Sequence, residues 1–312
     1  GGPHQSEEWY NEALKACGKS RDWKGALRLL AEMCRLGLCP QVEAYNGAMN
    51  VCRVCEQGAQ VLRLMRGMLQ DGPEPNRDSY WLALAVARDR RDWDWTVYLV
   101  DEALRRGVEM DDALQGVATF GLNWDPGQWA RGLELLGRLR RADVPPCAGA
   151  YANTIAGFIG TREHLSALLV LEDMRAAGVE PHGKAVHRAM CACGVAGGEW
   201  RRCLDVLGGW ERNGNEPEGR MLDVLSMSAA QADRWEAAYH SLARMRALGY
   251  EGGAATCGTV VVAYQRARKW DLASRLLEQM QGAEARQRQA PRLRRRSHNP
   301  TGPQPRPLGA AP

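Results

Sequence analysis

A self-similar pattern with a period of about 35 residues runs through most of this chain. Tyr10-Asn11 is followed by Tyr45-Asn46 at an interval of 35 residues, and Tyr80 follows at the same interval. The same position recurs at steps of 35 or 36 residues at Gln115, Tyr151, Val186, Leu222 and Cys257. We term Tyr10 and these equivalents the register residues. Such a period is typical of a solenoid, in which each unit packs only against its neighbours, so the sequence predicts eight stacked units.

Tryptophan recurs at one position of these units and locates two single-residue insertions. Four tryptophans stand thirteen residues after the register residue of their unit: Trp23, Trp93, Trp235 and Trp270. Trp129 and Trp200 stand fourteen residues after theirs, in the two units that are 36 residues long. The extra residue therefore falls in the first half of the fourth and sixth units. We expect the tryptophans themselves to pack between neighbouring units.

The apolar spacing and turn residues of each unit predict two helices separated by a turn. In the first unit, one face of the second helix carries apolar side chains at i, i+3, i+4 and i+7, namely Ala26, Leu29, Leu30 and Met33. Asp22-Trp23 opens this helix, and Gly37 ends it, with Pro40 three residues further on. Aspartate is a good N-cap, and glycine readily adopts the left-handed conformation that ends a helix. Helices this short bury their apolar faces only when units stack.

Three features of these units resemble the pentatricopeptide repeat. They are the tyrosine-asparagine start, an Ala-Leu pair in the second helix, and a Met-x-x-x-Gly-x-x-Pro ending from Met33 to Pro40. The stretch Glu172–Pro181 carries the closest single match. The fourth unit departs from the pattern with Leu139, Asp143 and Pro146 at the Met, Gly and Pro positions. The 34-residue tetratricopeptide repeat lacks this ending and has a different period.

The resemblance covers residues 8–281 and implies both a fold and a function. The fold is all-α, a right-handed α-solenoid superhelix of about eight helix-turn-helix units of 35–36 residues. Residues 1–7 remain as an N-terminal flank and residues 282–312 as a tail. The family typically binds single-stranded RNA in mitochondria or chloroplasts, with one base per unit. The resemblance therefore implies an organellar RNA-binding protein that acts in RNA processing, stability or translation.

In the family, the residue after the register residue and the last residue of the unit contact the edge of one base. The resemblance transfers this role to seven pairs: Asn11 with Gln41, Asn46 with Asn76, Trp81 with Asp111, Gly116 with Cys147, Ala152 with His182, His187 with Glu218, and Asp223 with Gly253. Only Asn46 with Asn76 matches a combination that is common in the family, one that favours a pyrimidine and especially cytosine. Glycine and alanine side chains offer a base neither a donor nor an acceptor.

A second position weakens the expectation of base recognition. In the family, an apolar residue two positions before the register residue wedges between bases, and we term this the wedge position. No valine, isoleucine or leucine stands there in this chain, which has Glu8, Glu43, Asp78, Ala113, Gly149, Lys184, Arg220 and Ala255. Carboxylates oppose the binding of a polyanion. The alternative is a repeat scaffold for protein–protein contacts in an organellar ribonucleoprotein such as the mitoribosome, with base recognition lost.

The residues of the best pairs also have structural interpretations that the sequence leaves open. Asn46 and Asn76 suit a helix start and a turn as well as a base edge. Trp81 suits stacking on a base, and it equally suits packing between first helices.

Positive charge is concentrated at one end of the chain. The net charge is +4, and residues 281–312 hold seven arginines and one glutamate, which leaves 34 basic and 36 acidic residues in 1–280. This end is also rich in proline, glycine and glutamine, so we expect residues 282–312 to be disordered. Its run of basic side chains is a candidate contact for phosphate groups, at Arg292, Arg294, Arg295 and Arg296.

No group of residues predicts catalysis, a metal site or a cofactor. Cys52-x-x-Cys55 and Cys191-x-Cys193 lie four units apart, with no histidine at ligand spacing. The stretch 178–184 resembles a phosphate-binding loop, but alanine follows its lysine where serine or threonine must hold magnesium. We therefore expect no enzyme and no small-molecule substrate. No apolar run approaches the ~20 residues of a membrane span, and single cysteines recurring at one helical position indicate a reducing compartment.

Overall fold

The computed structural model describes residues 7–121, 129–161, 163–195 and 199–289. These residues form sixteen α-helices and contain no strand. The first helices of the eight units are α1 (Glu7–Ser20), α3 (Val42–Val54), α5 (Arg77–Asp89), α7 (Asp112–Phe120), α9 (Ala148–Ala156), α11 (Gly183–Val195), α13 (Gly219–Gln231) and α15 (Ala254–Arg266). The second helices are α2 (Trp23–Arg35), α4 (Gly58–Gln70), α6 (Trp93–Arg105), α8 (Trp129–Arg141), α10 (His164–Ala176), α12 (Trp200–Arg212), α14 (Trp235–Ala247) and α16 (Trp270–Gln289).

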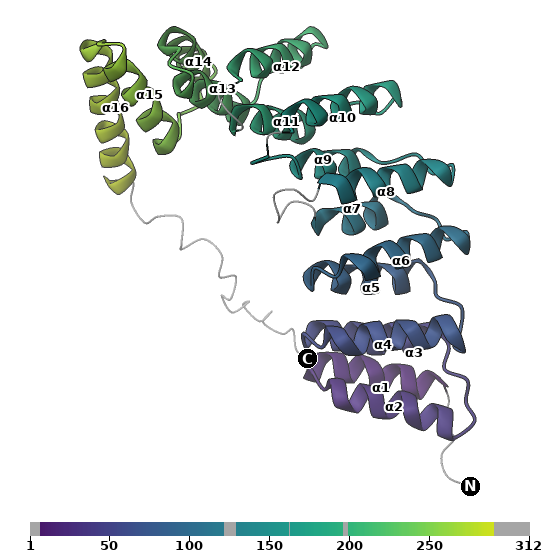
Figure 1. The fold of residues 1–312 in the computed structure, drawn as a ribbon. Helices are drawn as coiled ribbons and strands as arrows, with labels where there is room; N and C mark the ends of the chain where they lie inside the picture. Colours follow the sequence, from purple (N-terminus) through teal and green to yellow (C-terminus); the bar gives the residue numbers. More distant parts are fainter. Residues whose placement is uncertain (1–6, 122–128, 162, 196–198, 290–312) are drawn as a thin grey trace, which may run out of the picture.

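The helices are packed as antiparallel pairs that follow one another along an arc (Figure 1). Each first helix packs against the first helix of the next unit, from α1 with α3 to α13 with α15. Second helices pack mainly on the first helices of their own unit and of the next one, as α4 does on α3 and α5. The expected α-solenoid of helix pairs is therefore confirmed. Its first helices form one continuous layer, and the outward surface of that layer is termed the first-helix face below.

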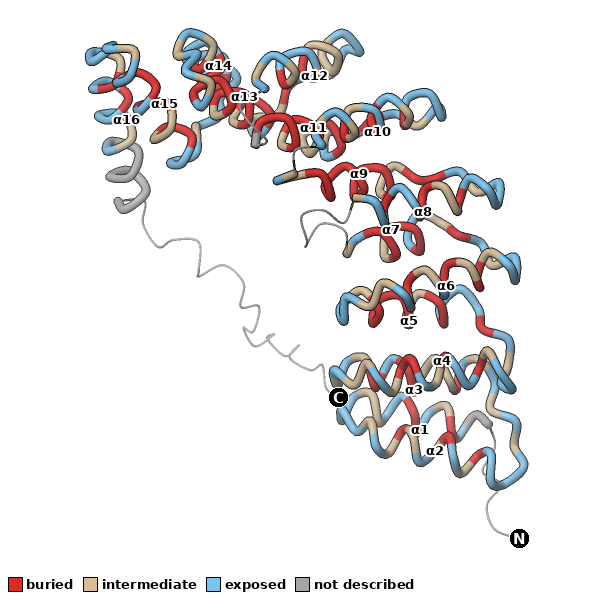
Figure 2. The backbone as a smooth tube through the Cα atoms, in the orientation of Figure 1, coloured by how far each residue is buried: buried red, intermediate tan, exposed pale blue. Residues whose placement is uncertain are grey.

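The buried residues lie along the boundary between the two layers and form four hydrophobic clusters that follow one another along the chain (Figure 2). The register residues Tyr10, Tyr80 and Tyr151 are completely buried, and so are Val186 and Leu222. Methionines of the repeat ending lie in the same core, at Met33, Met68, Met174 and Met245. Each fully buried apolar side chain of this size contributes about 1.5–3 kcal/mol, so stacking of units supplies most of the stability.

Local chemistry sets the ends of the helices as the sequence predicts. The Asp22 carboxylate caps α2 by accepting the Gly25 N–H at 2.9 Å. Gly37 follows the helix with φ +74°, and the Leu38 N–H bonds the Met33 carbonyl at 3.0 Å. Asp143, which replaces glycine in the fourth unit, also adopts a positive φ of 58°. Aspartate tolerates this left-handed conformation better than most side chains, so the departure from the pattern does not break the unit.

All six recurrent tryptophans begin a second helix. Five of them are half-buried against the hydrophobic core, which matches the expected packing between units, whereas Trp270 in the last unit is 59% exposed. The single-residue insertions of the fourth and sixth units were expected before Trp129 and Trp200. Just before these tryptophans, residues 122–128 and 196–198 lie outside the described part of the chain.

The last helix extends further than the sequence suggested. Helix α16 continues to Gln289, so the boundary expected at residue 281 is not a helix end. The run from Arg292 to Arg296 lies outside the described part of the chain.

Candidate nucleic-acid interface

The base-edge pairs meet where one unit passes into the next. The last residue of a unit is the N-cap of the following first helix at Gln41, Asn76, Asp111, Cys147, Glu218 and Gly253. An N-cap side chain turns back toward the first turn of its own helix, because it accepts hydrogen bonds from the N–H groups there. The side chains of Asn76, Asp111 and Cys147 accept such a bond, and a base would have to share their polar atoms with the helix. Gln41 and Glu218 make no such bond, and Gly253 has no side chain.

Asn46 and Asn76 are brought into direct contact. The Asn46 amide donates to Asn76 Oδ1 at 3.0 Å, and the Ser79 hydroxyl donates to Asn46 Oδ1 at 2.7 Å. Asn76 also accepts the Ser79 N–H at 3.1 Å, and Ser79 Oγ accepts the Asn76 N–H at 3.3 Å, which completes a capping box. Ser79 is fully buried, Asn46 is half-buried, and Asn76 is exposed. The two interpretations of this pair are therefore compatible, since Asn76 caps α5 while both amides stand side by side.

Trp81 and Asp111 do not present a free ring and a free carboxylate. The Arg53 guanidinium lies 5.5 Å from the centre of the half-buried Trp81 ring, a cation–π contact between α3 and α5. Asp111 accepts the Leu114 N–H at 2.9 Å and the Arg77 Nε–H at 2.7 Å. The Leu114 bond, and then Arg77, hold the pKa of Asp111 below its usual value. Trp81 thus packs between first helices, and Arg77 neutralises the carboxylate.

Asn11 and Gln41 are not joined by a hydrogen bond. Asn11 is half-buried and its Oδ1 atom is buried without a partner. Gln41 is exposed, and its amide donates to the Cys39 carbonyl at 3.4 Å. This pair leaves one acceptor without a hydrogen bond, the Asn11 Oδ1 atom. Asn11 also lines the groove between α1 and α3.

His182 and His187 lie half-buried near the start of α11. Burial lowers the pKa of both imidazoles, and the charge of Lys184 adds to this at His182, while that of Arg220 adds to it at His187. Both rings are therefore neutral near pH 7. Glu218, the partner expected for His187, instead pairs with Arg220 and lies against the backbone of α11. Positive charges of Lys184, Arg188 and Arg220 thus act on the histidines, opposed in part by Glu218.

A cationic cluster of Lys184, Arg188 and Arg220 lies on the first-helix face. The sequence pointed to Lys184 and Arg220 only as wedge residues and did not group them with Arg188. Arg188 is half-buried and donates to Asn153 Oδ1 at 2.8 Å, a neutral partner. Burial lowers its pKa, and the charge of Arg220 lowers it further. A half-buried guanidinium held by an amide gains free energy when an anion approaches. The i, i+4 spacing of Lys184 and Arg188 was the available signal.

The charge at the wedge positions changes sign along the first-helix face. Glu43 and Asp78 are exposed in the second and third units, whereas Lys184 and Arg220 are exposed in the sixth and seventh. A polyanion is therefore favoured at the later units and disfavoured at these two earlier wedge positions.

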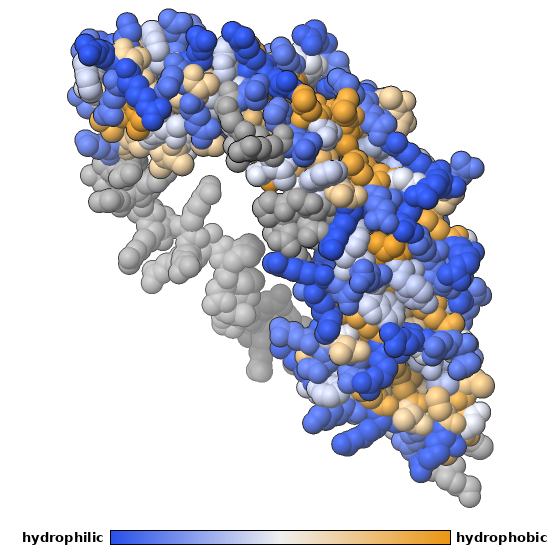
Figure 3. Space-filling view, viewed as in Figure 1, coloured by the Kyte–Doolittle hydropathy of each residue, from blue (hydrophilic) through white to orange (hydrophobic). Residues whose placement is uncertain are grey.

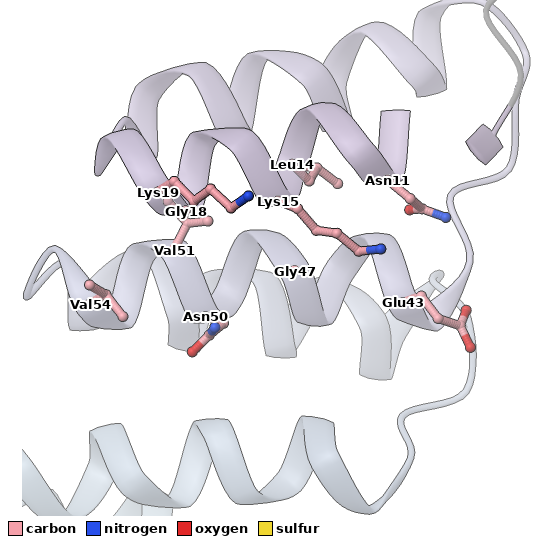
Figure 4. Close-up of a pocket in the computed structure, with 10 residues that line it drawn as sticks. All are labelled: Asn11, Leu14, Lys15, Gly18, Lys19, Glu43, Gly47, Asn50, Val51 and Val54. Atoms are coloured by element: carbon pink, nitrogen blue, oxygen red, sulfur yellow. The ribbon is translucent and has the colours of Figure 1, made fainter. Parts of the chain in front are cut away.

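A groove opens between α1 and α3 on the same face (Figure 4). Its volume is about 510 Å³, and all of its lining comes from these two helices: Asn11, Leu14, Lys15, Gly18, Lys19, Glu43, Gly47, Asn50, Val51 and Val54. The volume lies within the range of small-ligand sites. Sequence comparison between units did not indicate this groove, because it depends on how closely two helices approach.

Other kinds of site are not found among the described residues. They contain no group of three or more histidine, cysteine, aspartate or glutamate side chains that could hold a metal ion, and all ten cysteines are free thiols. Within the same residues, no helix is both long and apolar enough to cross a membrane. Cys52 and Cys193 are buried, and burial raises the pKa of each to about 11, while Cys17 at the equivalent position of the first unit is only half-buried.

The structure is an α-solenoid of helix pairs that repeat about every 35 residues, and the base-edge pairs lie where one unit passes into the next. The family model described as "PPR repeat" matches residues 10–38, the first unit and part of its turn. The chain is a pentatricopeptide repeat protein. No curated protein sequence matches it.

Solved structures show the same architecture. The pentatricopeptide repeat protein PPR10 from maize is 25% identical, with a TM-score of 0.63, over 88% of this chain and 39% of that one. PPR10 in complex with an 18-nt psaJ RNA element is 23% identical, with a TM-score of 0.54, over 88% and 38%. The PPR domain of Arabidopsis thaliana protein-only RNase P 1, in complex with tRNA, is 18% identical, with a TM-score of 0.49, over 58% and 95%. This chain thus spans about two fifths of PPR10.

Proposed function

We propose that this protein binds single-stranded RNA along its first-helix face and acts in the processing, stability or translation of RNA in a mitochondrion or chloroplast. Support comes from the pentatricopeptide fold, because the similarly folded PPR10 forms a complex with an 18-nt RNA element. The observation that carries the proposal for this chain is the Asn46–Asn76 pair, whose amides lie 3.0 Å apart on that face.

This pair retains hydrogen-bonding capacity for a base. A carboxamide has two N–H donors and two acceptor lone pairs. In Asn46, one N–H is used by Asn76 and one lone pair by Ser79, so one donor and one acceptor remain. In Asn76, the side-chain oxygen accepts the bonds described above, whereas its N–H donors are available to a base, and the side chain is exposed. Since Ser79 and the capping box hold both side chains in place, a pyrimidine edge would meet an arranged set of donors and acceptors.

The cationic cluster supplies the complementary contact with the backbone of RNA. Replacing Lys184 and Arg188 by alanine should weaken binding of every sequence alike and should lower the slope of log affinity against log salt by about 1.4, since each neutralised phosphate of a single strand contributes ~0.7. Lys24→Ala with Arg28→Ala is the matched control, because it removes two exposed cations from second helix α2. Equal slopes for both double variants would exclude the cluster from the contact.

A second candidate function is a scaffold for protein contacts in an organellar ribonucleoprotein. The observation in its favour is that three successive second helices each carry an exposed leucine within their first two turns, at Leu133, Leu169 and Leu204. Figure 3 shows hydrophobic side chains gathered over the region of α10 to α12 on an otherwise mainly hydrophilic surface. Contiguous exposed apolar surface is typical of protein interfaces.

Selection of binders from a random RNA library separates the two functions. The full chain is immobilised, bound RNA is amplified over several rounds, and the enriched sequences are compared with those from a variant that lacks both asparagines. Enrichment of a motif that contains a cytosine and is lost in the variant supports base recognition. A pool without any motif, bound with an affinity set only by salt, would contradict it and favour the scaffold.

A further inference from the structure

A groove with an aromatic wall lies between second helices α4 and α6, in the second and third units (Figure 1). Its volume is about 330 Å³. The lining residues are Arg66, Leu69, Gln70, Asp94, Trp95 and Tyr98. Since all of them belong to second helices, the groove lies apart from the first-helix face.

Trp95 and Tyr98 form the wall of this groove. Their rings meet edge to face, with centroids 5.5 Å apart and an interplanar angle of 89°. The Arg66 guanidinium lies 5.2 Å from the centre of the Trp95 ring, a cation–π contact from α4. Trp95 is half-buried, whereas Tyr98 is 46% exposed. These contacts hold the tryptophan ring in place and leave much of the tyrosine ring open to a partner.

The repeat does not require aromatic side chains at these two positions. Trp95 and Tyr98 stand two and five residues after Trp93, which begins α6. The other second helices that begin with tryptophan have Gly25 and Arg28, Arg131 and Glu134, Arg202 and Asp205, Ala237 and His240, and Leu272 and Arg275 there. Those units fold without the pair. Aromatic side chains are enriched at protein interfaces, so the pair of the third unit suits a contact with another chain.

The lining suits a proline-rich segment that carries a cation. Proline-rich chains dock in aromatic-lined grooves, because their polyproline II conformation is largely formed before binding. The backbone carbonyls of that conformation have no internal hydrogen bonds, and the Gln70 amide and the Tyr98 hydroxyl can donate to them. Asp94 is exposed at the same groove and attracts a positive charge.

This chain contains such a segment at residues 300–307, outside the described part of the structure. We term it the proline segment. Four of its eight residues are prolines, at Pro300, Pro303, Pro305 and Pro307, and Arg306 supplies a cation between the last two.

The length of the intervening chain favours the groove of a second copy. Residues 290–299 join α16 to the proline segment and span at most ~35 Å when fully extended. Helix α16 is five units from α6, or ~40–50 Å along the arc if neighbouring helices pack ~8–10 Å apart. A second copy can approach without this constraint.

We propose that the groove between α4 and α6 binds the proline segment of a second copy of this chain, with a proline ring against Trp95 and Tyr98 and with Arg306 beside Asp94. Two copies that exchange their segments form a closed dimer. The site lies on second helices, so the inference does not depend on the proposed RNA-binding function.

Binding of a synthetic peptide tests the site. A fluorescein-labelled peptide of residues 298–309 is titrated with the full chain carrying Pro303→Ala and Pro305→Ala, which disables the competing segment, and anisotropy gives the dissociation constant. Adding Tyr98→Ala should raise this constant by about tenfold or more, as for an aromatic side chain at the centre of an interface. Tyr239→Ala is the matched control, since this tyrosine is 44% exposed on second helix α14, and it should change nothing.

The charge contact has a test of its own. Asp94→Asn should weaken peptide binding by about two- to fivefold, the range for an exposed ion pair, and should have no effect on a peptide with Arg306→Gln. This comparison decides the matter if circular dichroism shows that Tyr98→Ala loses helicity. An equal loss for both peptides would then overturn the proposal.

Sedimentation velocity identifies the occupant. The unaltered chain should dimerise at concentrations above the dissociation constant of the peptide, whereas Tyr98→Ala and the double proline variant should stay monomeric. A peptide that does not bind, or that binds Tyr98→Ala equally well, would overturn the proposal. So would an unaltered chain that stays monomeric although the peptide binds, because a second copy would then not fill the groove. RNA binding is measured separately and stands or falls without these results.

Discussion

Removing both amides of the Asn46–Asn76 pair should abolish a preference for cytosine without unfolding the protein. The suitable change is Asn46→Ala combined with Asn76→Ser. Serine is about as good an N-cap as asparagine, so α5 keeps its cap, whereas alanine at this position would cost ~1 kcal/mol. The serine hydroxyl is too short to reach the side chain at position 46 and lacks an N–H group for a base.

The cost to stability follows from the contacts that are lost. Asn46→Ala removes one hydrogen bond to Asn76 and one from the Ser79 hydroxyl. The Ser79 oxygen still accepts the backbone N–H of residue 76, and its proton has the new hydroxyl within reach. Because the site is half-buried rather than dry, we expect the free energy of unfolding to fall by about 1 kcal/mol. Urea unfolding followed by circular dichroism measures this value.

The effect on RNA should depend on the base. Loss of one good base contact costs ~1–3 kcal/mol, so the dissociation constant for a 12-nt oligocytidine should rise by about 5- to 150-fold. The constant for a 12-nt oligoadenosine should stay within about twofold. Fluorescence anisotropy at two salt concentrations gives both constants, and the change for oligocytidine should persist at the higher salt because it does not come from phosphate contacts.

The matched control is Asn213→Ala, which removes an exposed amide at the end of second helix α12. It should change neither dissociation constant. Equal affinities of the double variant and the unaltered chain for both oligonucleotides would refute the reasoning, because the amides would then serve only the helix start. A loss that is the same for both bases would also refute it.

Three further predictions concern stability and reactivity. Glu102 is 3% exposed and pairs with two arginines of its own unit, so Glu102→Ala should lower the free energy of unfolding by about 2 kcal/mol in urea; an unchanged midpoint would contradict this. His182 and His187 have pKa values below those of the unfolded chain, so the unfolded state binds more protons and stability should fall as the pH drops below about 6.5. Replacing both by asparagine should flatten the decline, measured as urea midpoints at pH 7 and 5.5. Burial raises the pKa of Cys203 to about 12, so at pH 8 a thiol reagent should modify exposed Cys34 long before it modifies Cys203; equal rates in mass spectrometry would argue against this burial.

The fold could be predicted from the sequence because its determinants are local and are repeated. The aspartate before Trp23 caps α2, and Gly37 ends it, through contacts within five residues. Such signals do not depend on distant parts of the chain, and eight copies of them reinforce one another. The end of α16 was not predictable in the same way, since the helix continues into the polar, glycine-containing stretch after Gln281, where no repeat signal remains.

The candidate site could be predicted only in part. Its positions followed from the register, and the structure places Asn46 beside Asn76 as the family pattern implies. The third partner, Ser79, was missed because hydroxyls at helix starts are common and only its burial makes this one significant. The contact of Trp81 with Arg53 was also missed, since it joins positions 28 residues apart in sequence.

The sequence by itself therefore determined the period, the helix pairs and the places where they begin and end, because hydrophobic spacing, caps and turns act over a few residues. Only the tertiary structure decided which polar groups remain available to a ligand. It ties Asp111 to Arg77, leaves the Asn11 oxygen without a partner, and holds Arg188 against an amide rather than a carboxylate. These outcomes depend on how closely one unit approaches the next, a distance set by the packed side chains of both units together.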